Sequence, residues 1–350
     1  MMKTMRLLSL ATALAIGAGT SGQAANASLC YRGVNLSGGE YGDGKGVYGT
    51  NYIYPTEETV RYFAHSGMNA IRLPLKWERL QPELNQRLSA EEMRRLHEVV
   101  AMIRKAGMTV ILDPHNYAQY GEDKIGAGKL AAAHLADFWG RLAAEFAGDD
   151  GIVFGLMNEP FDIEGPVWLD AANQSIAAIR TAGARNLILV PGVIWSGAAT
   201  WYHDIPGGSN ASVMGGVKDP LGHYGYEFHQ YMDGDFSGQH PTCERAGEAR
   251  DAIRAVSEWL RKQGRKGLLG EFGGSSDKAC VEGLRGMTRA VAEDADVWMG
   301  WTYWAAGEWW PEDEPLNIQP RAHQKPRPQM RMLRAEMKAS PADPDRCALH

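Results

Sequence analysis

Eight short apolar segments recur along the chain, and their spacing constrains the fold more than any other feature of the sequence. Stretches in which apolar residues have helical periodicity separate most of these segments. The segments begin near Cys30, Asn69, Met108, Ile152, Leu187, Tyr224, Gly267 and Val297. Strands that alternate with helices over about 300 residues predict an α/β protein whose fold is a (β/α)8 TIM barrel, which commonly takes about 250 residues and more with insertions.

The helix after the second segment illustrates the pattern. Ser89 and Glu92 have the spacing of a capping box, apolar residues recur every three or four positions from Met93 to Ile103, and Gly107 ends the helix. Further helices are predicted over residues 56–65, 130–146, 167–181, 248–263, 280–293 and 329–338.

A doubly wound open sheet is the alternative arrangement of such strands and helices. It is disfavoured because no glycine-rich phosphate turn follows the first strand, and because polar residues end nearly all strands and not only those at one crevice. No linker rich in Ser, Thr or Pro divides the chain. We therefore expect residues 28–350 to form a single domain.

Charge and composition exclude one class of partner. Of the 350 residues, 44% are hydrophobic, and the formal net charge is −6. Without a basic stripe or a cluster of Lys and Arg interleaved with aromatic residues, the chain lacks the charges that would neutralise a phosphate backbone. We expect a globular protein that does not bind nucleic acid.

The first 27 residues have the features of a secretory signal peptide. Lys3 and Arg6 precede an apolar stretch over residues 7–18, which is too short to span a bilayer, and Ala25-Asn26-Ala27 resembles a cleavage signal. We predict cleavage before Ser28, although cleavage after Ala24 or Ala25 fits similar rules. Since no later stretch is long and apolar enough to span a bilayer, the mature protein is predicted to be secreted, either extracellular or periplasmic, without a membrane anchor.

Four cysteines in an exported chain predict two disulfides, for which three connectivities exist. In a closed barrel, Cys30 and Cys347 would lie on the face of the strand N-termini. Cys243 and Cys280 would lie in loops on the opposite face. The favoured pairs are therefore Cys30 with Cys347 and Cys243 with Cys280.

Polar and aromatic residues stand at or just after the end of nearly every predicted strand. They are Asn35, Arg72, His115, Asn116, Asn158, Glu159, Trp195, His229, Tyr231, Glu271 and Trp304. In a (β/α)8 barrel the C-terminal strand ends meet at one mouth and carry the chemistry. Each residue alone has a structural explanation, but their joint placement predicts an active site.

Glu159 and Glu271 follow the fourth and seventh strands, so that their carboxyl groups would face each other across the mouth. Such a pair is typical of glycoside hydrolysis, in which one group gives a proton to the leaving oxygen and the other attacks the anomeric carbon or activates water. Arg72 would keep Glu271 ionised, Tyr231 would donate a hydrogen bond to it, and His229 would orient Glu159.

An ordered set of motifs across these strand ends resembles glycoside hydrolase family 5, and within it most closely the endo-β-1,4-glucanases (cellulases) of subfamily 5. The resemblance covers essentially all of residues 28–350. The motifs are Gly67-Met-Asn-Ala-Ile-Arg-Leu-Pro, Trp77-Glu-Arg-Leu-Gln-Pro, Asp113-Pro-His-Asn-Tyr, Gly155-Leu-Met-Asn-Glu-Pro, His229-Gln-Tyr, Gly270-Glu-Phe-Gly-Gly and Gly300-Trp-Thr-Tyr-Trp-Ala.

The resemblance implies a retaining enzyme that acts on β-glucan, with Glu159 as acid/base and Glu271 as nucleophile. It further implies that Asn158 holds the sugar 2-hydroxyl and that Trp304 forms a stacking floor at the cleaved unit. The other substrate-binding positions that we assign are Arg72, His115, Asn116, His229 and Tyr231. No cofactor or metal is expected, and we expect a monomer.

Several aromatic residues are candidates for outer sugar subsites along an open cleft, with ordinary packing as the alternative for each. The candidates are Tyr41, Trp77, Trp195, Trp201 and Trp309. Tyr41, Trp195 and Trp309 are preferred because they follow strand ends directly.

Two hypotheses from other classes stay open on the sequence alone. A metal-dependent hydrolase would use Asp113, His115, His203, His229 and Glu271, but the chain has no His-x-His pair. A non-catalytic glucan-binding barrel would be expected to lack one of the two glutamates. Mannan, xyloglucan, lichenan or β-1,3-glucan could also replace cellulose, because this scaffold changes substrate through its loops.

Overall fold

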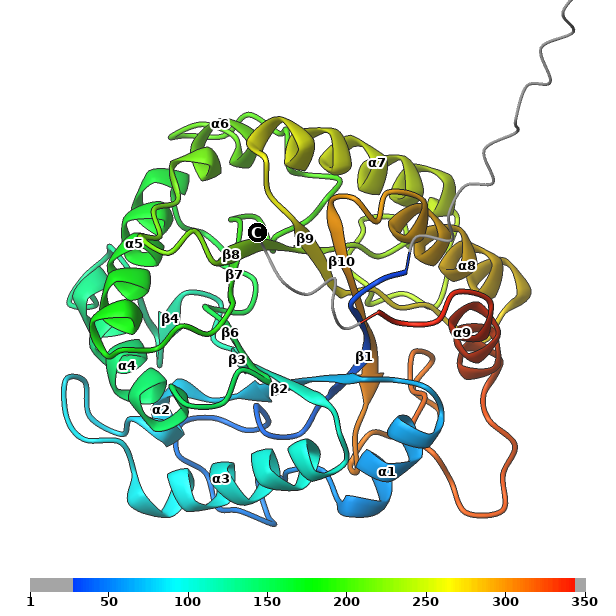
Figure 1. Cartoon of the computed structure of the whole chain (residues 1–350), viewed down its shortest axis with the longest axis horizontal. Helices are drawn as coiled ribbons and strands as arrows, with labels where there is room; N and C mark the ends of the chain where they lie inside the picture. The colour runs from blue at the N-terminus through cyan, green and yellow to red at the C-terminus, as the bar shows by residue number, and fades with distance from the viewer. Residues whose placement is uncertain (1–27, 344–350) are drawn as a thin grey trace, which may run out of the picture.

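The computed structural model describes residues 28–343, which form a closed barrel of parallel strands inside a ring of helices (Figure 1). The barrel strands are β1 (Tyr31–Leu36), β2 (Ala70–Leu75), β3 (Thr109–Pro114), β6 (Ile152–Gly155), β7 (Ile188–Pro191), β8 (Tyr224–His229), β9 (Gly267–Glu271) and β10 (Trp298–Ala306). Their order around the barrel is β1-β10-β9-β8-β7-β6-β3-β2, and all neighbours are parallel. This confirms the predicted (β/α)8 barrel, and each strand begins at the predicted residue or one later.

The longer helices make up the outer ring in Figure 1. They are α1 (Glu57–His65), α3 (Ala90–Lys105), α4 (Ala132–Phe146), α5 (Gly165–Thr181), α7 (Ala246–Gln263), α8 (Lys278–Glu293) and α9 (Pro328–Ala339). The shorter elements are α2 (Trp77–Leu80), the hairpin β4 (Gln119–Tyr120) and β5 (Asp123–Lys124), α6 (Asn210–Val213) and the 3-10 helix η1 (Met214–Gly216). Between β7 and β8 the chain forms only α6 and η1, which matches the absence of a long periodic stretch there.

The predicted capping box of α3 is only half present. Ser89 Oγ accepts the backbone N–H of Glu92 at 3.3 Å, as expected. The Glu92 carboxylate does not reach back to the cap, because it is buried and accepts hydrogen bonds from Tyr52 (2.5 Å) and Tyr54 (2.7 Å). A tertiary contact with the loop after β1 therefore outweighs the local one.

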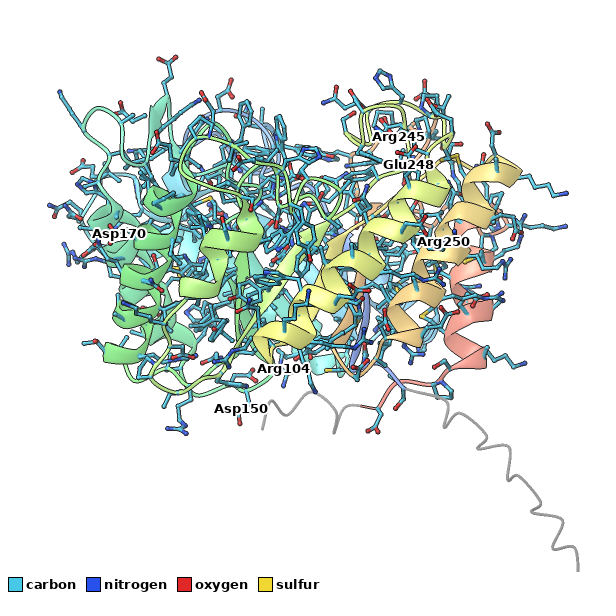
Figure 2. The ribbon with its side chains drawn as sticks, turned by 90° about the horizontal axis from the view of Figure 1, so that it is seen from above. Arg104, Asp150, Asp170, Arg245, Glu248 and Arg250 are labelled. Atoms are coloured by element: carbon cyan, nitrogen blue, oxygen red, sulfur yellow. A yellow bond between two sulfur atoms is a disulfide. The ribbon has the colours of Figure 1, made fainter. Side chains whose placement is uncertain are left out.

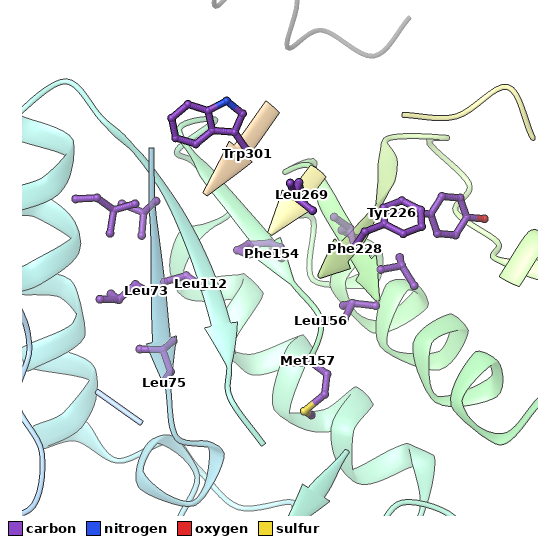
Figure 3. Packing of buried hydrophobic residues seen from close by; sticks show 14 of the residues in the cluster. Leu73, Leu75, Leu112, Phe154, Leu156, Met157, Tyr226, Phe228, Leu269 and Trp301 are labelled. Carbon is purple, nitrogen blue, oxygen red and sulfur yellow. The ribbon is translucent and has the colours of Figure 1, made fainter. Parts of the chain in front are cut away.

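Alternation along the strands produces two apolar layers. Outward-facing side chains such as Leu73, Leu112, Phe154 and Phe228 pack between the barrel and the helices and form the main core (Figure 3). Inward-facing side chains toward the N-terminal ends of the strands form a second buried cluster at the floor of the barrel. Its members include Ala70, Ile111, Val153, Leu189, Leu268 and Met299. The barrel floor is thus a packed core.

Above this floor the barrel interior becomes polar. Arg72 lies two residues after Ala70 on β2, and Asp113 lies two residues after Ile111 on β3. Both side chains are fully buried. Glu227 occupies the corresponding inward position on β8 and is also buried. Charged groups that are buried this deeply require partners. These side chains pair with one another and with the polar residues nearer the C-terminal ends of the strands.

The face that carries the C-terminal strand ends can be followed in the side view of Figure 2. Arg245 and Glu248, which lie at the start of α7 just beyond the loop after β8, mark this face, and Arg104 near the end of α3 marks the opposite one. None of the helices within residues 28–343 is long and apolar enough to cross a membrane. The predicted signal peptide, residues 1–27, lies outside the described residues.

One predicted disulfide is confirmed. Cys243 in the loop after β8 is bonded to Cys280 in the first turn of α8, with a Cα–Cα distance of 5.2 Å. The second predicted pair, Cys30 with Cys347, cannot be followed because Cys347 lies outside the described residues.

Removal of the Cys243–Cys280 bond by the double change Cys243→Ala and Cys280→Ala should lower the free energy of unfolding by about 4 kcal/mol. In the loop-entropy model, a bond between residues 37 positions apart raises the free energy of the unfolded chain by about this amount, because it reduces the conformational entropy of that chain. Equilibrium unfolding in urea would measure the loss. An unchanged midpoint and slope would show that the loop after β8 is held by other contacts.

Candidate active site

The two glutamates reach the barrel mouth through local departures from regular strand geometry. Glu159 follows β6 and has a left-handed backbone (φ 43°), which turns the chain sharply after Asn158. On β9, Leu269 pairs with Phe228 but Glu271 pairs with His229, so Gly270 is an extra residue in the ladder. Such a bulge redirects the following side chain, and it explains how Glu271 faces the interior.

Glu159, His229 and Glu271 offer ligand atoms that all lie within 4.8 Å of one another. The two carboxyl groups are therefore close. Retaining glycosidases hold their carboxyl groups about 5–5.5 Å apart, whereas inverting enzymes need about 6.5–9.5 Å to accommodate a water molecule. Carboxyl oxygens this close fit the spacing of the retaining class.

Both oxygens of Glu271 have hydrogen-bond donors. Arg72 Nη1 lies 2.9 Å from Oε1, and the Tyr231 hydroxyl donates to Oε2 at 2.8 Å. Burial raises the pKa of Glu271 above its ordinary value, while the charges of His229 and Arg72 oppose that rise by favouring the carboxylate. The predicted contacts of Arg72 and Tyr231 with this residue are present.

Glu159 is more open than Glu271. Its side chain is 16% exposed toward the cleft, and its Oε1 lies 2.7 Å from Nδ1 of His229. The predicted contact between His229 and Glu159 is therefore also present. Of the two carboxyl groups, Glu159 is therefore the more accessible from the cleft.

Arg72 lies beneath the pair and does not reach the cleft. Its partners, at 2.8–3.0 Å, are Asn35, Asp113, Asn158, Glu227 and Glu271. Burial lowers the pKa of the Arg72 guanidinium, but the surrounding carboxylates raise it further, so the charge is permanent. Arg72 therefore contacts Glu271 as predicted, but its fully buried side chain offers no surface to a sugar, which differs from a substrate-binding position.

His115 and Trp304 form one wall of the site. Their rings stack at 5.3 Å with planes 17° apart. His115 Nδ1 lies 2.7 Å from Asp113, and its Nε2 lies 3.1 Å from the amide nitrogen of Asn158. Because Arg72 Nη2 donates to Asn158 Oδ1 at 2.8 Å, the orientation of that amide is fixed.

Asn116 differs from its prediction. Its amide oxygen accepts the backbone N–H of Trp77 at 2.8 Å, and its amide nitrogen donates to Glu78 at 2.7 Å. Protein partners thus use both ends of the amide, and the residue is buried. It supports the wall of the site and offers no free polar group to a sugar.

A cavity of about 700 Å³ extends from Glu159, His229 and Tyr231 toward the loops after β6, β7 and β8. Trp195 and Phe161 line it, and their rings stack at 4.4 Å with planes 17° apart. Trp195 is 45% exposed, and the three consecutive residues 194–196 all have left-handed backbones. Phe161 was missed in the sequence, although it directly follows the Asn-Glu-Pro motif.

Two of the five aromatic candidates for outer subsites are wrong. Trp77 and Trp201 have no exposed surface. Trp77 packs against Phe138 and Tyr120, and Trp201 packs against Phe228 and Trp259. The remaining three candidates, Tyr41, Trp195 and Trp309, are partly or largely exposed.

The ligand set of the metal hypothesis is not brought together. Within residues 28–343, two groups of three side chains have ligand atoms close enough for a metal ion: Glu159 with His229 and Glu271, and Asp233 with Asp235 and His240. His203 belongs to neither and is exposed in the loop after β7. In the second group both Asp233 oxygens already accept hydrogen bonds from the turn over residues 237–240.

The barrel and the close glutamate pair together define a retaining glycoside hydrolase. Comparison with known proteins gives the family. Residues 24–307 match the family model described as cellulase (glycosyl hydrolase family 5). The chain belongs to glycosyl hydrolase family 5.

Individual relatives share most of the chain. The endo-beta-1,4-glucanase B of Emericella nidulans is 32% identical over 314 residues, which cover 88% of this chain and 92% of the relative. The crystal structure of an endo-beta-1,4-glucanase from Xanthomonas axonopodis pv. citri is 43% identical, with a TM-score of 0.87 over 89% of this chain and 99% of that one. XacCel5A, solved in complex with cellopentaose, is 42% identical, with a TM-score of 0.86 over 88% of this chain and 99% of that one.

Proposed function

We propose that the protein is an endo-β-1,4-glucanase that hydrolyses internal bonds of cellulose or a related β-glucan with retention of configuration. The observation that carries this proposal is the pair Glu159 and Glu271, with oxygens within 4.8 Å at the mouth of the barrel. The endo-β-1,4-glucanase relatives, which share 32–43% of their aligned residues with the chain, support β-1,4-glucan as the substrate.

In the first step, Glu271 attacks the anomeric carbon while Glu159 gives its proton to the glycosidic oxygen, and the bond between that carbon and that oxygen breaks. A covalent glycosyl ester on Glu271 results. In the second step, Glu159 takes a proton from water, which attacks the same carbon and releases Glu271 as a carboxylate. The donors Arg72 and Tyr231 stabilise that carboxylate as it leaves.

The sugar at the cleaved bond would meet Trp304 and Asn158. The Trp304 ring, held parallel to His115, offers a flat apolar surface to the sugar face. The amide nitrogen of Asn158 is available for a sugar hydroxyl when it leaves His115, since its oxygen stays bound to Arg72. Further along the cleft, the stacked pair of Trp195 and Phe161 would support the departing chain, and Tyr41 and Trp309 are candidates for the outer sugars.

Trp195→Ala should raise the KM for cellopentaose about ten-fold and leave kcat nearly unchanged, because burial of an indole face against a sugar contributes about 1.4 kcal/mol, equivalent to a factor of ten. Initial rates measured over a range of cellopentaose concentrations would separate the two constants. Tyr202→Ala is the matched control, since Tyr202 is equally exposed (49%) on the same connection but does not line the cavity. An equal effect of both changes would remove Trp195 from substrate binding.

The proposed activity is tested with a panel of soluble polysaccharides: carboxymethylcellulose, mixed-linkage β-glucan, xyloglucan, mannan and laminarin. Viscosity and reducing ends are followed together. A rapid fall in the viscosity of carboxymethylcellulose would support internal β-1,4-glucan cleavage. Activity on mannan or xyloglucan alone would keep the glutamate pair but replace the substrate, and inactivity on all five would favour a glucan-binding barrel.

Export is part of the same proposal, because a polymeric glucan is found outside the cytoplasm. Residues 1–27 have the sequence features of a signal peptide, and residues 28–350 would be the catalytic domain of the mature enzyme. We further propose that the enzyme is a monomer. It would work without a cofactor, since the chemistry of the site needs only the two carboxyl groups and water.

A further inference from the structure

A third glutamate lies directly beneath the catalytic pair and has no role in the mechanism above. Glu227 precedes His229 by two residues on β8, and its buried side chain points into the barrel. Its Oε1 lies 3.1 Å from Nε2 of His229 and 2.8 Å from Nε of Arg72. Gly270 on β9 leaves room for it, because a Cβ there would lie 2.3 Å from the same oxygen.

The two neighbours of the His229 ring determine which of its nitrogens carry protons. Nδ1 faces an oxygen of Glu159 at 2.7 Å, and Nε2 faces an oxygen of Glu227 at 3.1 Å. An ionised carboxylate can only accept hydrogen bonds. Nε of Arg72 lies 2.8 Å from the same Glu227 oxygen, so that oxygen is an acceptor and Nε2 donates to it. With the Glu159 proton on its other oxygen, Oε1 accepts from Nδ1, and the ring is an imidazolium.

His115 offers an internal contrast, because its sequence context is so similar. Asp113 precedes His115 by two residues on β3, as Glu227 precedes His229, and also lies against Arg72 at 3.0 Å. However, the second nitrogen of His115 faces the amide nitrogen of Asn158, which is a donor. His115 Nε2 must therefore accept, and the hydrogen-bond geometry makes the ring neutral in this arrangement. Burial lowers the pKa of His115, but the Asp113 carboxylate raises it above its ordinary value, so the contrast between the two rings rests on the amide of Asn158 and not on their pKa shifts.

We propose that Glu227 is a positioning residue that keeps His229 charged throughout the reaction, so that a fixed cation stabilises Glu159 when it becomes a carboxylate. This inference rests on the acid/base role proposed for Glu159. As Glu159 gives its proton to the leaving oxygen, it gains a negative charge 2.7 Å from Nδ1 of His229, which keeps both of its own protons. Preorganised charge of this kind is worth most in a buried site.

The charges around His229 support this assignment. Burial lowers the pKa of His229, but Glu271, Glu159 and Glu227 together raise it to about 10. Asp113 adds a further negative charge nearby, and Arg72 is the positive charge that opposes them. Because the carboxylates outnumber the guanidinium, the ring holds its proton across the neutral range.

The test is a titration of the histidine rings by NMR, with selectively labelled imidazole carbons and the His229 signal assigned from a His229→Gln variant. In the unaltered enzyme, His229 should have the shifts of an imidazolium at least up to pH 8. In Glu227→Gln the side chain keeps its shape but loses its charge, and the titration midpoint of His229 should fall by about one to three pH units. A neutral His229 in the unaltered enzyme at pH 7 would overturn the inference even if the variant did not fold.

Two further variants sharpen the result. Glu227→Asp retains the charge and should keep His229 protonated at pH 7. Asp113→Asn removes an equivalent carboxylate from Arg72 but contacts His115 and not His229, so it should move the His229 midpoint less than Glu227→Gln does. If the His229 midpoint moved equally in Glu227→Gln and Asp113→Asn, the direct contact between Glu227 and His229 would not be the cause, and the inference would be overturned.

The kinetics separate this inference from the proposed function. Glu227→Gln should lower kcat/KM on carboxymethylcellulose about ten-fold or more, and should lower it less on an activated aryl cellobioside, which needs little proton donation. If the unaltered enzyme cleaves carboxymethylcellulose but kcat/KM of the variant falls equally on both substrates, the inference fails and the proposed function stands. If the unaltered enzyme cleaves no β-glucan, the proposed function fails, while the titration still decides the charge of His229.

Discussion

Glu271→Gln is expected to lower kcat on carboxymethylcellulose and cellopentaose by about 10⁴-fold or more, because no other group lies in place to form the covalent intermediate. The amide retains the size of the carboxyl group. Its oxygen can still accept from Arg72, and its nitrogen can donate to the hydroxyl oxygen of Tyr231, so the fold and the affinity for cellopentaose should change little. Turnover assays and calorimetric titration with cellopentaose would measure the two properties separately.

Glu92→Gln is a suitable control for this change. Glu92 is also buried and also accepts hydrogen bonds from tyrosines, but it lies on α3 outside the site. It should lose stability without a comparable loss of kcat. Near-normal turnover by Glu271→Gln would remove this residue from the mechanism, whatever the control does.

Glu159→Gln is expected to lose activity in a manner that depends on the leaving group. On carboxymethylcellulose, whose leaving alcohol needs a proton, kcat/KM should fall by about 10²–10⁴-fold, which is the usual contribution of general acid catalysis. On 2,4-dinitrophenyl cellobioside, whose leaving group needs no proton, the first step should largely recover, and the covalent intermediate should accumulate because the base for the second step is lost.

Rapid-mixing measurements of dinitrophenol release would show this as a burst followed by slow turnover. Glu271→Gln serves as the contrast, since it should fail on both substrates. An equal loss of kcat/KM on both substrates in Glu159→Gln would contradict the acid role and leave Glu159 with only an electrostatic one.

The fold was largely predictable because the barrel imposes strong local patterns. Strands covered on both faces are continuously apolar, and the helices between them have a clear period, so even the strand starts were predicted to within one residue. Polar residues that interrupt apolar strands, such as Arg72 and Asp113, are conspicuous for the same reason. What the sequence did not reveal is how deep each of these residues lies.

Depth depends on side-chain packing between distant elements. Trp77 and Trp201 lie in the connections after β2 and β7, and Trp195 also lies after β7. However, Trp77 packs onto α4, and Trp201 packs against β8 and α7. The bulge at Gly270 could not be predicted either, because it arises from the register between β8 and β9. Glu227 appeared in the sequence only as a polar interruption of β8, and its meaning depends on Arg72 and His229, which lie on either side of it.

The central claim is that Glu271 attacks the sugar while Glu159 handles the proton. Inactivation with 2,4-dinitrophenyl 2-deoxy-2-fluoro-β-cellobioside, followed by peptide mass spectrometry, tests it most directly, because the fluorine slows the second step and traps the covalent intermediate. The account predicts one fluorocellobiosyl group per chain, attached to Glu271. A label on Glu159, or full inactivation with the label on any other residue, would contradict it.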